Sequence, residues 1–219
     1  MPVKAITNSG SKHMKVFIFH QYKALRNNFM GTFAHWQNHR AIWLTGASVA
    51  LFLEIFSWAF FQKYLRLSPC EMCVYIRFSM IAICLGGLIG AIKPANPACK
   101  LIGYAVVIWG IARGLMWNIR LEMENIRSAD PDWVSVCRPT SAEYPFKIPL
   151  DKWLPDHFRP AALCGHDSAE TFFGLNMAEW LFFVYAAFAL MIGLMLFSWL
   201  AATLAARKTA YCGSLKNGM

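Results

Sequence analysis

The chain has 219 residues, of which 57% are hydrophobic and 15% are charged. This apolar share is well above that of ordinary soluble domains, and the apolar residues fall into blocks of about twenty, the length that an α-helix needs to cross roughly 30 Å of hydrocarbon. The formal net charge is +9, but the basic residues flank the apolar blocks, and this placement argues against a nucleic-acid-binding protein.

The first forty residues form a basic segment ahead of the first apolar block. They contain no acidic residue, and their basic residues are Lys4, Lys12, Lys15, Lys23, Arg26 and Arg40. Their only apolar run, VFIF, is too short for a secretory signal. We expect a solvated tail that fixes the membrane topology, and a tail that lies on anionic lipid is the alternative.

Four apolar blocks follow this tail. A backbone in lipid must satisfy its own hydrogen bonds, and the blocks lack the alternation of barrel strands, so we interpret them as helices. The predicted fold is an all-α membrane protein, a bundle of four transmembrane helices. The helices are expected at about 41–61, 74–92, 101–119 and 180–206, with loops at 62–73 and 120–179 and a tail at 207–219.

The charges between the blocks predict the orientation. Basic residues predominate in the first forty residues, in the short connection with Lys93 and Lys100, and after Ala206, whereas the loop 120–179 holds ten acidic and six basic residues. By the positive-inside rule the basic regions lie in the cytoplasm. We expect a bacterial inner-membrane protein with both termini in the cytoplasm and two periplasmic loops.

The second periplasmic loop is long for a connection without regular structure, which favours a function. Its segment FKIPLDKWLPDHF, residues 146–158, mixes apolar residues, one tryptophan and charges. We interpret it as a short segment on the membrane surface, and an ordinary proline-rich loop is the alternative. A surface segment would keep Cys137 and Cys164 near the bilayer.

This topology divides the seven cysteines. Four lie on the oxidising side, where disulfides persist: Cys70, Cys73, Cys137 and Cys164. The other three, Cys84, Cys99 and Cys212, receive no role.

Three interpretations compete for the pair Cys70 and Cys73. A zinc site would need a second close pair, which the spacing of Cys137, Cys164 and the outer histidines does not provide. A structural disulfide across two intervening residues would stabilise weakly, because it removes little chain entropy. Thiol–disulfide exchange is the use that the pattern favours.

The residues around this pair support exchange. Ser68 and Glu71 have the spacing of a capping box, so the helix is expected to begin at Ser68, with both cysteines in its first turn and a half. The helix dipole favours a thiolate there. Arg77 lies four residues after Cys73 on the same face, where it would favour the thiolate or hold a polar ligand; an arginine that extends to lipid headgroups is the alternative.

Two charges lie within the predicted spans. Glu54 and Arg113 fall at similar depth in the outer half of the first and third helices, and we expect that they can pair. Charges within a membrane are expensive and often functional, but a structural ion pair explains these two equally well.

The chain resembles the DsbB family of membrane disulfide oxidoreductases over about residues 41–197, and more closely its DsbI branch. The resemblance rests on PCEMCVYIR, WGIARG, a second outer cysteine pair and PLDKWLPDHF between the members of that pair. It implies a four-helix fold and an enzyme that supports disulfide bond formation. The forty-residue extension and the short tail after Ala206 point to the DsbI branch.

The resemblance also implies roles for residues. A periplasmic thioredoxin-fold dithiol partner, DsbA-like or DsbL-like, would attack Cys137, and electrons would pass through Cys164 to the Cys70–Cys73 disulfide. Cys73 would react with a bound quinone, ubiquinone or menaquinone, and Arg77 stands where the family has its quinone-associated arginine. The relay of DsbA, DsbB and quinone is itself a known system.

Two departures from the family pattern affect these expectations. The family often has a histidine near the outer end of the third helix, where this chain has Leu121, so Arg77 is expected to carry more of the quinone contact. Glu71 adds a negative charge between the first two cysteines, which should disfavour the thiolate.

Two rival functions remain open. A non-enzymatic membrane assembly protein would hold static disulfides and carry no quinone. An enzyme like vitamin K epoxide reductase would also combine four helices with a Cys-x-x-Cys pair, but in that family the active pair lies near the last helix.

Overall fold

The structure is a computed structural model that describes residues 35–138, 142–165 and 171–216. The chain forms two compact units: His39–Ile192, and Met1–Asn38 together with Gly193–Met219. Residues 1–34 of the predicted basic tail lie outside the described residues. The four outer cysteines all belong to the first unit.

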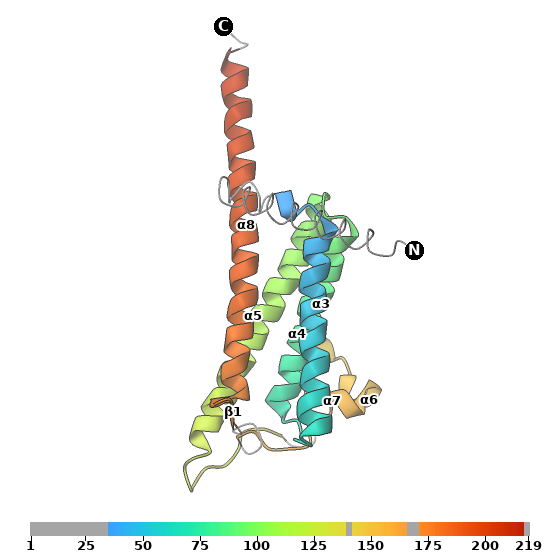
Figure 1. Ribbon diagram of the computed structural model, residues 1–219, viewed down its shortest axis with the longest axis vertical. Coiled ribbons are helices and arrows are strands. Elements are labelled where there is room, and N and C mark those ends of the chain that lie inside the picture. The colour runs from blue at the N-terminus through green and yellow to red at the C-terminus, as the bar shows by residue number, and fades with distance from the viewer. Residues whose placement is uncertain (1–34, 139–141, 166–170, 217–219) are drawn as a thin grey trace, which may run out of the picture. The chain divides into compact units, whose positions relative to one another are not determined.

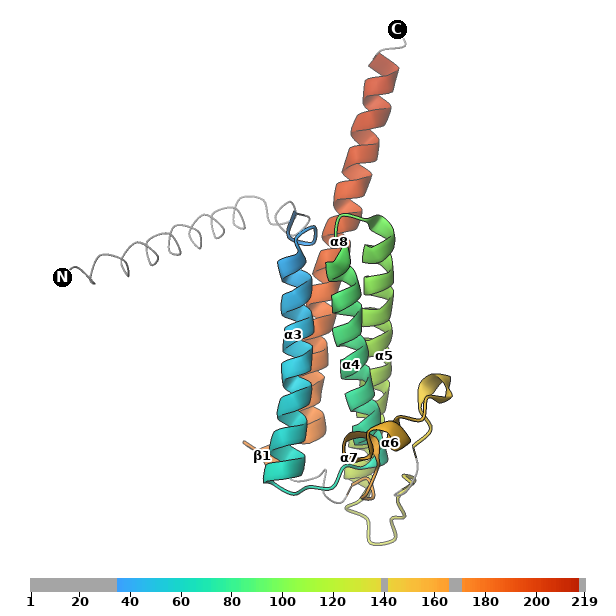
Figure 2. The same ribbon diagram turned by 90° about the vertical axis from the view of Figure 1, so that its right-hand side faces the viewer.

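Four helices in the described part of the chain are long and apolar enough to cross a membrane. The predicted class, an all-α four-helix membrane protein, is confirmed. The helices are α3 (Arg40–Ser57), which continues as the π-helix η1 (Trp58–Tyr64), α4 (Glu71–Ile92), α5 (Pro97–Arg127) and α8 (Met177–Lys216). In the first unit α3, α4 and α5 run side by side (Figures 1 and 2).

Short elements make up the rest of the first unit. They are the 3-10 helix η2 (Pro145–Lys147), α6 (Leu150–Trp153), α7 (Pro155–Phe158), β1 (Thr171–Phe172) and β2 (Leu175–Asn176). The two strands are antiparallel, with Thr171 opposite Asn176 and Phe172 opposite Leu175. The segment predicted to lie on the membrane surface therefore contains two single-turn helices, α6 and α7, beside the end of α4 (Figure 2).

Helix α5 is longer than the predicted span. Asn96 caps its start, because its side chain accepts a hydrogen bond from the backbone N–H of Ala98 (3.0 Å), and Pro97 occupies the first helical position. The helix ends at Arg127, eight residues beyond the predicted Ile119. At 1.5 Å per residue its 31 residues span roughly 46 Å, more than the hydrocarbon thickness. Its last turns therefore extend past the hydrocarbon.

Helix α4 is the central helix of this unit. In its most apolar window 67% of the residues are buried, against 17% for α3 with η1 and 39% for α5. Two glycines allow its close approach to α5: a Cβ atom on Gly86 would lie 3.0 Å from the carbonyl oxygen of Gly103, and one on Gly103 would lie 3.0 Å from that of Gly86. Small residues at such contacts let transmembrane helices pack closely. The central helix holds the first cysteine pair at its N-terminal end.

Candidate functional site

Helix α4 begins later than the capping box predicts, with Cys70 rather than Ser68 as its N-cap. Helix α4 begins at Glu71, and Cys70 is its N-cap, so the expected start at Ser68 is wrong. The reason is a long-range contact: the carbonyl oxygen of Pro69 accepts hydrogen bonds from the N–H groups of Ala161 (2.9 Å) and Ala162 (3.3 Å). This contact holds the residues before Glu71 in an extended conformation.

The first cysteine pair is buried at this helix start. Cys70 is 2% exposed and Cys73 is 7% exposed, and their Sγ atoms are 2.7 Å apart. The Sγ atom of Cys70 also accepts a hydrogen bond from the backbone N–H of Cys73 (3.4 Å). The hydrogen bond to the Cys73 side chain, together with burial, raises the pKa of Cys70 well above its ordinary value. Cys70 therefore stays a thiol at neutral pH, which leaves Cys73 as the better candidate for a thiolate.

The second cysteine pair lies beside the first. Cys137 and Cys164 form a disulfide, with Cα atoms 5.7 Å apart. Two backbone contacts hold this disulfide against the start of α4. The N–H of Arg138 donates to the Glu71 carboxylate (2.7 Å), and Cys70 forms an isolated parallel bridge with Ala162. All four cysteines thus meet at one end of α4.

Glu71 anchors the second loop. One carboxylate oxygen accepts from Arg138, and the other accepts a hydrogen bond from the Tyr75 hydroxyl (2.9 Å). The Tyr75 hydroxyl in turn accepts from the backbone N–H of Glu143 (2.8 Å). The sequence suggested only that Glu71 would disfavour a thiolate, whereas the structure gives it a positioning role next to Cys137.

Arg77 is buried one turn below Cys73. It is 4% exposed, and its Nη1 donates to the Gln62 side-chain oxygen (2.8 Å) and to the backbone carbonyl oxygen of His157 (2.9 Å). Its Nε atom is buried and has no hydrogen-bond partner among the described residues. A buried, unpaired donor on a cation is costly, which indicates a missing acceptor at this point.

An apolar cavity of about 280 Å³ opens beside Arg77 and Cys73. Helices α3, α4 and α8 and the π-helix η1 contribute its walls. Its other lining residues include Glu54, Phe60, Phe61, Ile76, Met80, Phe173, Trp180, Leu181 and Val184. A mostly apolar pocket with a few converging polar groups is the usual form of a site for a small organic ligand.

The predicted pairing of Glu54 with Arg113 is wrong. Glu54 is 5% exposed and bonds to the ring of His157 instead, with 2.7 Å between Oε1 and Nε2. The loop carries α7 to the end of α3, and so brings His157 within reach of this buried carboxylate, which Arg113 does not reach. Sequence reasoning gave no role to His157 or Gln62; the only signal was that His157 lies within the predicted surface segment, residues 146–158. Leu121, where the family pattern has a histidine, is fully buried.

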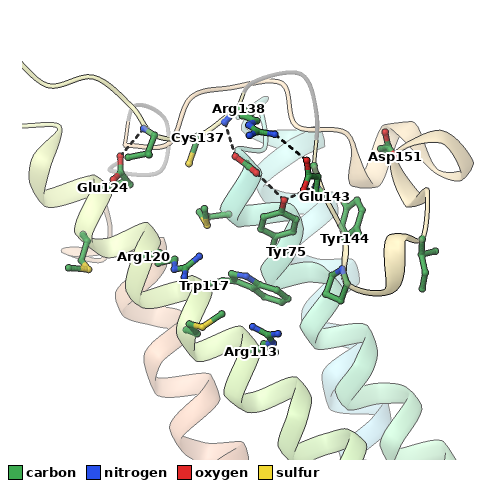
Figure 3. Close-up of a pocket in the computed structure, with 18 of the residues that line it drawn as sticks. Tyr75, Arg113, Trp117, Arg120, Glu124, Cys137, Arg138, Glu143, Tyr144 and Asp151 are labelled. Atoms are coloured by element: carbon green, nitrogen blue, oxygen red, sulfur yellow. Dashed lines mark hydrogen bonds and ion pairs between the residues drawn. The ribbon is translucent and has the colours of Figure 1, made fainter.

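A second, larger cavity of about 1170 Å³ lies between α4, α5 and the loop that follows Cys137 (Figure 3). Its lining includes Cys137 and several charged residues, among them Arg113, Arg120, Arg138 and Glu143. Cys137 is 4% exposed and Cys164 is fully buried. Of the two, Cys137 is the one that lines this cavity, so an attacking thiolate can reach it more directly than Cys164.

Cys84 and Cys99 line neither of these cavities. Cys84 is buried within α4 and Cys99 is partly exposed near the start of α5, while the side chain of Cys212 lies outside the described part. Among the described residues there is no group of three or more His, Cys, Asp or Glu side chains that could hold a metal ion.

The chain is similar to proteins that act on disulfides. A candidate protein-disulfide oxidoreductase DsbI of Campylobacter fetus is 42% identical over 151 residues, which cover 67% of this chain and 69% of the relative. The protein-disulfide oxidoreductases DsbI of Salmonella typhimurium and Lelliottia amnigena are 38% and 40% identical over 157 and 152 residues, covering 69% and 67% of this chain and 69% and 68% of the relatives.

A wider match covers all four helices. Residues 39–207 match the family described as Disulfide bond formation protein DsbB. This match begins just before α3 and ends within α8, and it includes every residue of the two cysteine pairs. The resemblance predicted from the sequence motifs is therefore confirmed, and the chain belongs to the DsbB family.

Proposed function

We propose that this protein-disulfide oxidoreductase reoxidises a periplasmic thioredoxin-fold dithiol protein, DsbA-like or DsbL-like, and passes the electrons to a membrane quinone. The oxidoreductase class follows from the family. The observation that supports the finer proposal is the arrangement of the four cysteines. Two pairs meet at the start of α4, and one member of each pair lines a different cavity: Cys137 the charged one, Cys73 the apolar one.

The first exchange occurs at Cys137. A partner thiolate attacks its Sγ, the Cys137–Cys164 bond breaks, and Cys164 leaves as a thiolate. The second partner thiol then attacks the mixed disulfide, so the partner leaves oxidised and Cys137 and Cys164 are left reduced. Two electrons have entered the protein, and the two thiol protons of the partner have been released.

The second exchange regenerates the outer disulfide. Cys164 attacks Cys70 of the Cys70–Cys73 disulfide and displaces Cys73 as a thiolate, which α4 places at its N-terminus, where the helix dipole stabilises negative charge. Cys137 then attacks Cys164, which restores the outer disulfide and releases Cys70. Once released, Cys70 takes up a proton, because its hydrogen bond with the Cys73 side chain and its burial raise its pKa.

The apolar cavity fits a quinone ring. Its apolar walls match a lipid-soluble ligand, and the unpaired Nε of Arg77 supplies a donor for a carbonyl oxygen. A bound quinone would supply the two-electron oxidant that returns Cys70 and Cys73 to a disulfide. Arg77 would bind and orient it, Cys73 would face it, and Glu54 and His157 would form the polar end of the cavity.

The protein is a multi-pass inner-membrane protein. The proposed topology has both termini in the cytoplasm and the active cysteines in the periplasm. The structure is consistent with this orientation, because the cysteines lie at one end of α4 and Lys93 follows its other end. The basic connection would then face the cytoplasm.

The test is quinone reduction by the purified full chain with a reduced thioredoxin-fold dithiol protein, followed by absorbance. We expect Cys73→Ser to abolish reduction and the matched control Cys84→Ser, in the same helix, to leave it intact. Reduction that persists in Cys73→Ser would contradict the proposed relay. Absence of reduction in the wild type with ubiquinone and menaquinone analogues, while both disulfides resist exchange, would favour a non-enzymatic assembly protein.

A further inference from the structure

A row of arginines follows one face of α5. Arg113, Arg120 and Arg127 are spaced by seven residues, or about two turns, and all three line the larger cavity (Figure 3). Lys147 joins them from the facing loop, with a backbone φ of 54° that lysine rarely adopts. The cavity wall therefore concentrates cations from two separate elements.

Several charges of this cavity are already neutralised. Arg127 pairs with Glu124 (3.4 Å), Arg138 pairs with Glu143 (3.2 Å), and Glu71 accepts from Arg138 and Tyr75. In the part of the chain that the structure describes, the side chains of Arg113, Arg120 and Lys147 form no hydrogen bond or ion pair, and Asp151 is the one lining acid whose side chain is in the same condition. The unpaired lining groups are thus mainly cationic.

Two of these cations, Arg113 and Arg120, lie toward the lower end of the cavity. Figure 3 shows Arg113 and Arg120 on either side of Trp117, at the opposite end from Cys137 and Arg138. Trp117 is 6% exposed, and Met116 lies next to it in the lining. The cations therefore surround an apolar floor, whereas the acids and the redox cysteine lie at the upper end.

The depth of Arg113 indicates the kind of anion. Counted from Pro97, Arg113 lies roughly 24 Å along a helix that crosses about 30 Å of hydrocarbon, and Arg120 lies about 10 Å further. A water-soluble protein cannot reach the depth of Arg113. A lipid phosphate, in contrast, lies at the boundary between hydrocarbon and water, and a long arginine side chain can extend toward it. Guanidinium groups bind phosphate oxygens through two parallel hydrogen bonds.

We propose that Arg113 and Arg120 at the lower end of this cavity, together with Lys147 of the same lining, bind the phosphate headgroup of an anionic phospholipid. The lipid phosphate accepts hydrogen bonds from the two guanidinium groups and the ammonium group, and its acyl chains run along Met116 and Trp117. Basic pockets between membrane helices are the typical binding sites of anionic headgroups. This site is separate from the apolar cavity beside Cys73, and the proposal does not depend on the quinone link.

The test is lipid retention by the detergent-solubilised full chain, measured by native mass spectrometry with equal amounts of phosphatidylglycerol and phosphatidylcholine. We expect the wild type to retain phosphatidylglycerol about tenfold more, because both lipids have a phosphate but the cationic lining repels the quaternary ammonium of phosphatidylcholine; tenfold corresponds to about 1.4 kcal/mol. Arg113→Gln with Arg120→Gln should remove this preference. Arg159→Gln, an exposed loop arginine outside the cavity, should keep it.

Three further measurements keep the proposal falsifiable. Arg113→Lys with Arg120→Lys should keep part of the preference, because lysine keeps the charge but lacks the planar guanidinium group. This variant tests the proposal even if the glutamine variant does not fold. A wild type without preference, or an equal loss in Arg159→Gln, would overturn the site. Displacement of the lipid by equimolar glycerol 3-phosphate would overturn its lipid specificity, and loss of partner binding with lipid retention unchanged would assign the cations to the partner.

Discussion

The two cavities of this protein differ in the way that the two reactants of the proposed relay differ. The cavity beside Cys137 is large and charged, whereas the cavity beside Cys73 is small, apolar and close to the buried Arg77. A dithiol protein stays in water and a quinone stays in lipid, so one relay needs two different environments. Residues at the start of α4 line both cavities, and in the proposed relay the four cysteines would carry electrons from one to the other.

This difference also explains why the cysteines belong to two separate segments. A single pair would have to face both cavities. Here Pro69 and Glu71, on either side of Cys70, bind the loop segments that hold Cys164 and Cys137. In the proposed relay the second pair can thus contact the partner while its disulfide is held against the start of α4.

Removing Cys137 should have the largest effect, and it should stop the reaction with the dithiol protein while the reaction with quinone continues. We expect Cys137→Ser to reduce oxidation of the dithiol protein by more than about a thousandfold, as loss of a reacting group commonly does. Reduction of quinone by a small dithiol such as dithiothreitol should continue, because this reagent can reach Cys70 and Cys73 without the outer pair. The two substrates are compared in one absorbance assay, with Cys99→Ser as the control. Equal loss with both substrates would show that the cavities are not independent.

Changing Arg77 should affect only the apolar cavity. Arg77→His or Arg77→Gln should weaken apparent quinone affinity by roughly 10-fold to 100-fold, the range for hydrogen bonds from charged groups. Arg77→Lys should restore part of it, since the charge is kept. Exchange between the two cysteine pairs, followed by trapping of mixed disulfides, should change little. An unchanged quinone response in Arg77→His would contradict the assigned role.

A change of Glu71 should affect exchange between the two cysteine pairs. Glu71→Ala removes the acceptor for Arg138 and Tyr75, so the loop with Cys137 should be held less firmly and exchange between the pairs should slow by about tenfold. Quinone affinity should remain unchanged. The control is Glu143→Ala, because the Glu143 side chain is 86% exposed and its ion pair with Arg138 contributes little. If both variants behave alike, Glu71 has no special positioning role.

Local sequence patterns predicted the helices because each apolar block is its own signal. They also predicted both cysteine pairs on one side of the membrane, and the structure brings the two pairs together at the start of α4. The patterns did not identify the helix start at Glu71 or the partner of Glu54. Both depend on contacts from the second loop: Glu54 and His157 are 103 residues apart, and their pairing needs α7 to fold against α3 first. A contact between residues that are far apart in the sequence does not alter the local pattern of apolar residues, so this pattern could not predict it.

His157 should give the smallest effect, because it contacts two residues that line the apolar cavity, Glu54 and Arg77, and only the contact with Glu54 depends on its side chain. His157→Ala removes the ring that bonds to Glu54, but the backbone carbonyl that accepts from Arg77 remains. We expect apparent quinone affinity to fall by about threefold, the scale of one ordinary hydrogen bond, with exchange at Cys137 unchanged. Asp156→Ala is the matched control, because Asp156 contacts the Gln62 side chain only through its own backbone oxygen, which the substitution keeps. A loss as large as that of Arg77→Gln would mean that the Glu54–His157 contact, rather than Arg77, governs the polar end of the cavity.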